Sequence, residues 1–136
     1  MTFFEKELRK IVGPQRPEAI YVGRASYVRL SERNRAKIHF TTCGTANQYE
    51  ALQISILNRN DGKIDSLCLR FADVWGKGQN SNINIQQIGP YAWTYNGNTD
   101  WYSYHPTDRD FEKLTDAVMG YLDVFQEFEQ EWEQQM

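Results

Sequence analysis

The alternation of apolar and polar residues predicts an α+β fold, with a single antiparallel sheet of about six strands covered by helices on one face. Three stretches place an apolar side chain at every second position, which is typical of strands with one buried face. Two further stretches, one short and N-terminal and one long and C-terminal, repeat apolar residues at helical spacing. With 136 residues, the chain is expected to form one α+β domain, 1–136.

The two helices are predicted at the ends of the chain. Residues 3–12 form the short one, because Phe4, Leu8 and Ile11 recur at helical spacing before Gly13-Pro14 ends it. The long one runs from 108 to about 134 and carries the stripe Phe111, Leu114, Val118, Tyr121, Phe125, Phe128 and Trp132. It is roughly 40 Å long, against some 25–30 Å for six strands. Its last turns would therefore overhang and pack on the N-terminal helix, on a second copy in a homodimer, or on a partner.

The strands are predicted between these helices. Residues 19–30 form the first, and a polar turn at 31–34 leads into a clean alternation from Arg35. Two more follow, with Leu52, Ile54 and Ile56 and then Leu67, Leu69 and Phe71 facing inward across a hairpin turn at 60–63. Residues 73–90 are rich in Gly and Asn and are predicted to be a binding loop. A last hairpin joins 91–95 to 101–104 through Asn96-Gly97.

Composition and motifs exclude several classes. Hydrophobic residues make up 40% and aromatic residues 14% of the chain, which argues against intrinsic disorder. No signal-peptide pattern and no apolar run of about 20 residues is present, so we expect a soluble, cytoplasmic protein. Nucleophile elbows, phosphate loops and metal-ligand spacings of His or Cys are also missing. We therefore expect no metal, no cofactor and no enzymatic activity.

The net charge of −3 hides an uneven distribution. Residues 1–70 hold 12 Lys/Arg and 7 Asp/Glu, a net +5, whereas residues 71–136 hold 3 and 11, a net −8. The candidate basic surface on the first hairpin and fourth strand comprises Arg24, Arg29, Arg33, Arg35, Lys37 and Arg70, interleaved with Tyr21, Tyr27 and His39. Cations follow phosphates and exposed aromatic rings stack on bases, so this surface suits single-stranded nucleic acid. It equally suits an acidic protein surface, or simple solvation of a strand edge.

The candidate acidic surface lies on the long helix and comprises Asp116, Asp123, Glu127, Glu129, Glu131 and Glu133. Carboxylates on a rigid helix could occupy the groove in which a nucleic-acid-binding protein expects phosphates. The alternative is that they only keep the protein in solution. Four further candidate contacts, from the loop and the aromatic hairpin, are Trp75, Lys77, Trp93 and Trp101. Packing within the hairpin or the core is the alternative for Trp93 and Trp101.

Three runs resemble a known group of proteins: Leu69-Arg70-Phe71-Ala72-Asp73, Trp93-Thr94-Tyr95-Asn96-Gly97, and Trp101-Tyr102-Ser103-Tyr104-His105-Pro106-Thr107. The group consists of small proteins carried by conjugative and other mobile elements of Gram-positive bacteria, and the resemblance covers most of the chain. It implies a setting in which small acidic proteins inhibit host defence, as anti-CRISPR and antirestriction proteins do, by binding and without turnover.

Three functional hypotheses follow. The first is a non-catalytic inhibitor whose protein partner is a host nuclease that targets nucleic acids. The second is an accessory protein that binds single-stranded nucleic acid through the basic first hairpin. The third is a small-molecule binder or enzyme in which the sheet and the long helix enclose an apolar cavity.

Overall fold

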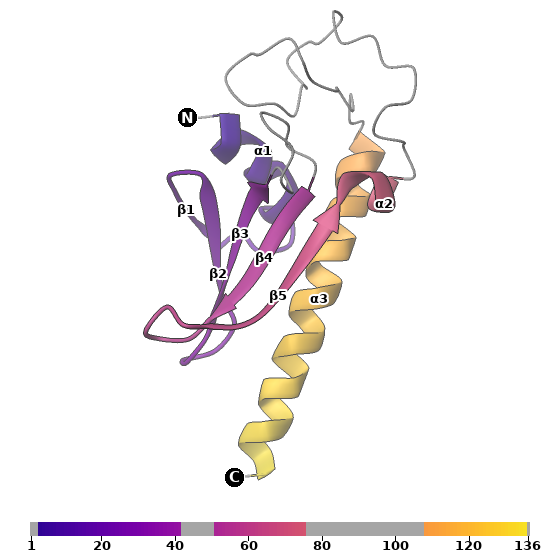
Figure 1. Cartoon of the computed structure of the whole chain (residues 1–136). Coiled ribbons are helices and arrows are strands. Elements are labelled where there is room, and N and C mark those ends of the chain that lie inside the picture. Colours follow the sequence, from indigo (N-terminus) through magenta and orange to yellow (C-terminus); the bar gives the residue numbers. More distant parts are fainter. Residues whose placement is uncertain (1–2, 42–50, 76–107, 136) are drawn as a thin grey trace, which may run out of the picture.

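Two helices cover one face of a five-stranded antiparallel sheet in the computed structural model, which describes residues 3–41, 51–75 and 108–135 (Figure 1). In chain order the elements are α1 (Phe3–Val12), β1 (Ile20–Val22), β2 (Ala25–Arg29), β3 (Arg35–Thr41), β4 (Ala51–Leu57), β5 (Lys63–Arg70), α2 (Phe71–Trp75) and α3 (Asp108–Gln135). The predicted α+β class is thus confirmed, as are both terminal helices. The predicted hairpin at 91–104 lies outside the described residues.

The sheet is a meander in which each strand pairs with the next along the chain, in the order β1-β2-β3-β4-β5. Its register places Ile38 opposite Ile54, and Ile54 opposite Leu67. Directly paired residues share a face, so the apolar positions of all three strands point the same way. Ile38 and Ile54 are fully buried, whereas Leu67 on the edge strand is half-buried. The predicted one-sided sheet is therefore confirmed.

The stretch 19–30, predicted as one strand, is instead the hairpin formed by β1 and β2. Val22 pairs with Ala25, so Gly23 and Arg24 are the two central residues of a tight turn. Gly23 has a φ of +61°, as the first central position of a type II′ turn requires. The prediction of a single strand was wrong because the β-branched and aromatic residues on both sides of Gly23 are typical of one continuous strand, and a turn of only two residues interrupts that pattern too briefly to be recognised.

The chain also leaves the sheet earlier than predicted, because Phe71 begins the short helix α2 instead of ending β5. Residues 73–75, predicted as the start of a loop, belong to this helix. Trp75 is only 6% exposed, its ring stacks on Phe71 with centroids 4.9 Å apart, and its indole N–H donates to the Asp110 carbonyl over 2.8 Å. Trp75 therefore joins α2 to α3 in the core and is not the exposed contact residue predicted.

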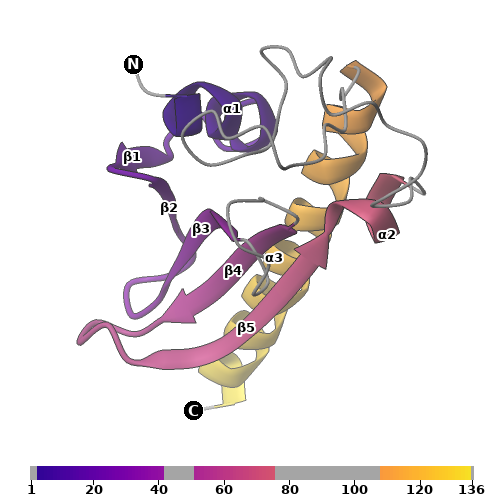
Figure 2. The same cartoon turned by 45° about the horizontal axis from the view of Figure 1, so that its top comes forward.

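Helix α3 crosses behind the sheet, with α1 beside its N-terminal half (Figure 2). Leu114, Val118 and Leu122 are fully buried against the sheet. The Thr115 hydroxyl, also buried, lies 2.7 Å from the Ile11 carbonyl oxygen, so it satisfies a carbonyl at the C-terminus of α1. The C-terminal end of α3 extends beyond the sheet, as its length predicts.

Arg16, which follows α1 in the chain, forms hydrogen bonds with side chains in the middle of α3. Its Nη2 donates to Asp123 over 3.0 Å and to Gln126 over 2.6 Å. Gln126 in turn donates to the Leu30 carbonyl at the end of β2 over 3.0 Å.

Among the described helices, none is long and apolar enough to cross a lipid bilayer.

Candidate polyanion-binding face of the sheet

The face of the sheet turned away from the helices carries a row of cations. The register puts Tyr27 opposite Lys37 and Arg29 opposite Arg35, all on the side opposite the core. Likewise Ala51 pairs with Arg70 at the far edge. The outward positions of the five described strands hold five cationic residues and no Asp or Glu. The five are Arg29, Arg35, Lys37, Lys63 and Arg70. We call this surface the cationic face.

Aromatic rings lie among these cations. The guanidinium of Arg35 lies 4.8 Å from the centroid of the Tyr27 ring, a cation–π arrangement, and Arg35 also pairs with Asp61 in the β4–β5 turn. His39 is half-buried on the same face, and its Nδ1 lies 3.1 Å from the Phe40 carbonyl oxygen. Tyr27 and His39 therefore offer ring surface between positive charges, as the sequence predicts.

Tyr21, predicted to interleave with the cations, lies on the other side of the sheet. It pairs with Ser26, whose side chain is fully buried, and it packs against the core. The guanidinium of Arg9 on α1 covers its ring at 4.3 Å. Burial raises the pKa of the Tyr21 phenol, although the nearby Arg9 charge lowers it in part. Tyr21 thus contributes to the interior.

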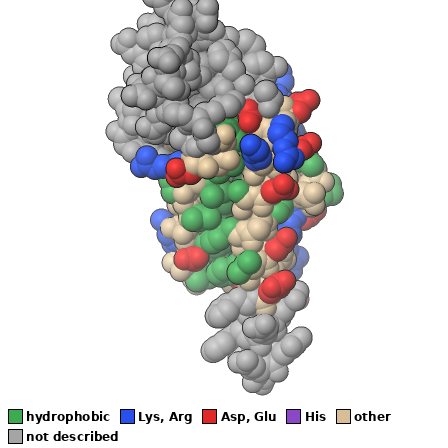
Figure 3. All heavy atoms as spheres, turned by 90° about the vertical axis from the view of Figure 1, so that its right-hand side faces the viewer, with side chains coloured by type: hydrophobic (Ala, Val, Ile, Leu, Met, Phe, Trp, Pro, Cys, Tyr) green, Lys and Arg blue, Asp and Glu red, His purple; other side chains and the backbone are tan. Residues whose placement is uncertain are grey.

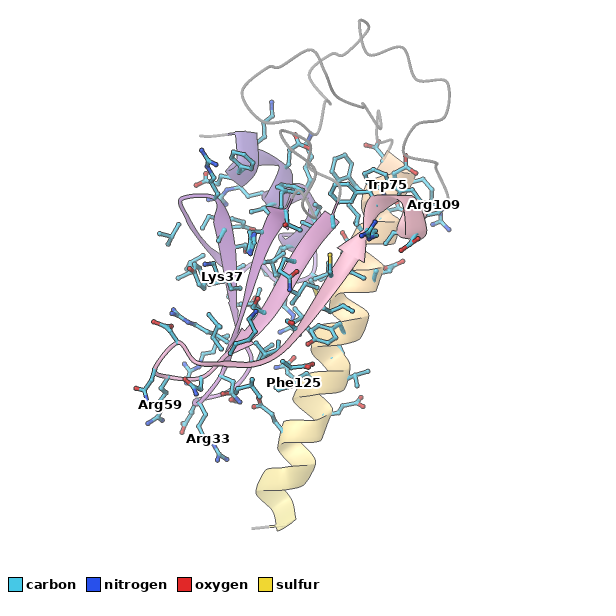
Figure 4. All side chains as sticks on the ribbon, viewed as in Figure 1. Arg33, Lys37, Arg59, Trp75, Arg109 and Phe125 are labelled. Atoms are coloured by element: carbon cyan, nitrogen blue, oxygen red, sulfur yellow. The ribbon has the colours of Figure 1, made fainter. Side chains whose placement is uncertain are left out.

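The remaining predicted basic residues lie in the turns at the two ends of the cationic face. Arg24 lies in the β1–β2 turn, with its guanidinium 5.1 Å from the Phe4 ring centroid. Arg33 lies in the β2–β3 turn at the other end, next to Arg59. Figure 4 shows Lys37 near the middle of the sheet and Arg33 and Arg59 at its lower end. The prediction missed Arg59 and Lys63. They could have been inferred, because alternate turns of a meander lie at the same end of the sheet.

Two surface hollows on the cationic face share Tyr27. One, of about 360 Å³, lies between Arg24, Lys37 and His39. The other, of about 410 Å³, lies at the turn end of the face. Its charged lining residues are the cations Arg29, Arg33, Arg35 and Arg59 and the acidic residues Glu18, Glu32 and Asp61. Together they form a shallow path along the sheet with cations at both ends.

The acidic candidates lie on α3, behind the sheet. Asp116 and Glu127 are exposed, but Asp123 is paired with Arg16, and half-buried Glu129 accepts a hydrogen bond from Asn34. Figure 3 shows acidic side chains spaced along α3 beside hydrophobic ones. The side chains of Glu131 and Glu133 lie outside the described part of the chain, as do Lys77, Trp93 and Trp101.

Neither a metal site nor an internal cavity emerges from the described residues. Within ranges 3–41, 51–75 and 108–135, no group of three or more His, Cys, Asp or Glu side chains is placed to hold a metal ion. Between the sheet and α3, core side chains such as Ile38, Ile54 and Leu114 have no accessible surface, which a ligand cavity beside them would create. Comparison with protein-family models, with curated proteins and with solved structures found no match.

Proposed function

We propose that this chain is a non-catalytic binding protein that holds single-stranded nucleic acid on its cationic face. The observation that carries the proposal is the set of five cations at outward strand positions, with no carboxylate among those positions. An open sheet face spaces such cations along a path, and phosphates along a single strand can meet them in turn.

The ring surface of Tyr27 and His39 supports a single strand over a duplex. Bases of a single strand are free to stack on aromatic side chains, and such stacking tolerates any sequence. The overall charge of −3 does not by itself oppose this binding, because α3, which carries the exposed Asp116 and Glu127, lies behind the sheet, and charges farther than a Debye length of about 8 Å are largely screened. Glu129 of α3 is nearer, since it accepts a hydrogen bond from Asn34 at the turn end of the cationic face.

Fluorescence anisotropy with labelled oligonucleotides tests the proposal. We expect the logarithm of the affinity to fall with the logarithm of salt concentration, with a slope of about −0.7 for each phosphate contacted. The double substitution Arg29→Glu, Lys37→Glu should weaken binding about tenfold or more at low salt and flatten the slope by about 1.4, because two contacts are lost.

The matched control is Lys6→Glu, Arg109→Glu, which changes the net charge equally on the helices. It should leave the affinity within about twofold, since a few exposed charges behind the sheet act only through screened fields. No binding at low salt, or an equal loss in both double variants, would refute the proposed function.

The second candidate is the inhibitor of a nucleic-acid-targeting nuclease, favoured by the exposed carboxylates of Asp116 and Glu127 on α3. It ranks second because Asp123 and Glu129 already bind Arg16 and Asn34. A cleavage assay with purified guide-RNA nucleases tests it. Inhibition should be lost in Asp116→Lys, Glu127→Lys, while undiminished cutting across a panel of nucleases would exclude it.

A further inference from the structure

A third hollow lies around the end of the sheet from the cationic face, between two turns and the C-terminal half of α3. Its volume is about 600 Å³. The β2–β3 turn contributes Arg33 and Asn34, the β4–β5 turn contributes Arg59, and Phe125 stands on the opposite wall, on α3. Figure 4 shows Arg33 and Arg59 side by side at this end of the sheet and Phe125 on α3. We call this hollow the end cleft.

The end cleft continues the path along the cationic face. It shares Arg33, Asn34, Asn58 and Arg59 with the hollow at the turn end of that face. That hollow in turn shares Tyr27 with the one beside Lys37 and His39. The three hollows therefore follow one another along the sheet and around its end, and α3 stands at the far side of the last.

The walls of the end cleft combine apolar and polar groups. Ile64 is 49% exposed and Phe125 is half-buried, so both present apolar surface to the cleft. Asn34 is held in place by two bonds, since its backbone N–H donates to Ser31 over 3.1 Å and its amide donates to Glu129. The Asn58 side chain accepts from the backbone N–H groups of Asn60 and Gly62, both over 2.9 Å, which fixes the other turn.

This combination matches a nucleotide. A base is flat and apolar on its faces, which suits Ile64 and Phe125, and polar at its edge, which suits the amides of the two turns. The phosphate that accompanies the base would meet the guanidinium groups of Arg33 and Arg59. The charged side chains that line the cleft are two guanidinium groups and one carboxylate, Glu129, which accepts a hydrogen bond from Asn34. This excess of positive charge favours an anionic occupant, and the apolar walls favour one with an aromatic ring.

We propose that the end cleft holds the terminal nucleotide of the single strand that lies on the cationic face. This inference rests on the proposed function. The base stacks on Phe125 and Ile64, and its phosphate binds Arg33 and Arg59. Because α3 stands at the far side of the cleft, the strand ends there, and the protein prefers a strand with a free end.

Oligonucleotides with a single abasic site test the inference in the anisotropy assay. Removing the terminal base at one end should weaken binding about tenfold, the order expected for one stacked base, whereas an internal abasic site should cost less. In Phe125→Leu and in Ile64→Ala the complete oligonucleotide should bind about as weakly as the terminally abasic one binds to the unaltered protein. Ile64→Ala guards against misfolding, since Ile64 lies on the surface.

Val124→Leu is the matched control, because Val124 is an exposed apolar residue of α3 that does not line the cleft, and it should retain the tenfold preference. If oligonucleotides bind but the terminal base makes no difference, the end cleft is not a nucleotide site and the proposed function stands. If Phe125→Leu and Ile64→Ala both keep the preference for the complete oligonucleotide over the terminally abasic one, the inference is also overturned. If no oligonucleotide binds, the proposed function fails and this inference fails with it.

Discussion

Tyr121 shows how one residue couples α3 to the edge of the sheet. Its hydroxyl donates to a carboxylate oxygen of Asp65 on β5. Burial and then the Asp65 carboxylate, as hydrogen-bond acceptor and as negative charge, raise the pKa of the Tyr121 phenol well above its usual value. The folded protein therefore keeps this proton in a pH range where the unfolded chain releases it.

The raised pKa of Tyr121 predicts a loss of stability in alkali. The contribution is complete below the ordinary tyrosine pKa of about 10 and is lost as pH rises above it, because unfolding then releases a proton. The loss should stay below ~1.4 kcal/mol per pH unit, since Tyr121 is partly exposed and solvent screens the contact. Urea unfolding of the protein and of Tyr121→Phe, at about pH 8 and about pH 10.5, checks this. An equal alkaline loss in both would contradict it.

At the scale of elements, the β1–β2 hairpin depends on one glycine. Gly23 has a φ of +61°, and no heavy atom lies within 4 Å of the position a Cβ would take. Glycine is therefore needed at position 23 for its backbone conformation, because a side chain there would meet no other atom. The turn reverses the chain so that β1 becomes the edge of the sheet and Arg24 lies at one end of the cationic face.

Gly23→Ala should therefore lower the free energy of unfolding by about 1 kcal/mol, the cost of left-handed backbone for an L-residue. Gly120→Ala is the matched control in the opposite direction. Gly120 lies exposed in the middle of α3 with nothing near its Cβ position, so alanine there should stabilise by about 0.5–1 kcal/mol. Chemical denaturation measures both, and equal effects of the two substitutions would contradict the assignment of strain to Gly23.

At the scale of the whole molecule, charge is divided between two sides. The cationic face lies on one side of the sheet, and α3, which carries the exposed residues Asp116 and Glu127, lies behind it. A protein with a net charge of −3 can therefore still present a positive surface to a polyanion.

This division predicts that the protein binds immobilised heparin at low salt, at a pH where its net charge is negative. Arg29→Glu, Lys37→Glu should elute in the flow-through, whereas Lys6→Glu, Arg109→Glu should be retained like the unaltered protein. The salt concentration at elution is the measurement. If both double variants elute alike, the positive charge does not act as a localised face.

Much of the cationic face could be predicted from local pattern. Strict alternation from Arg35 to Thr41 places Lys37 and His39 on the polar side of β3, and the register confirms that side as the one away from the helices. Trp75 could not be placed, because a tryptophan after a strand is equally compatible with a loop and with a helix that returns to the core. Its hydrogen bond to Asp110 joins residues 35 positions apart, which no local pattern reveals.

Hydrophobic periodicity was sufficient to determine the class of fold, the two terminal helices and the polar face of the strands, because burying one face of each element is a local requirement on spacing. The end cleft depended on tertiary structure alone. Its walls come from two turns and from α3, segments brought together by the meander and by the path of the helix behind it. Spacing along a chain records which side of an element is buried, but which elements meet is decided only when their buried sides pack together.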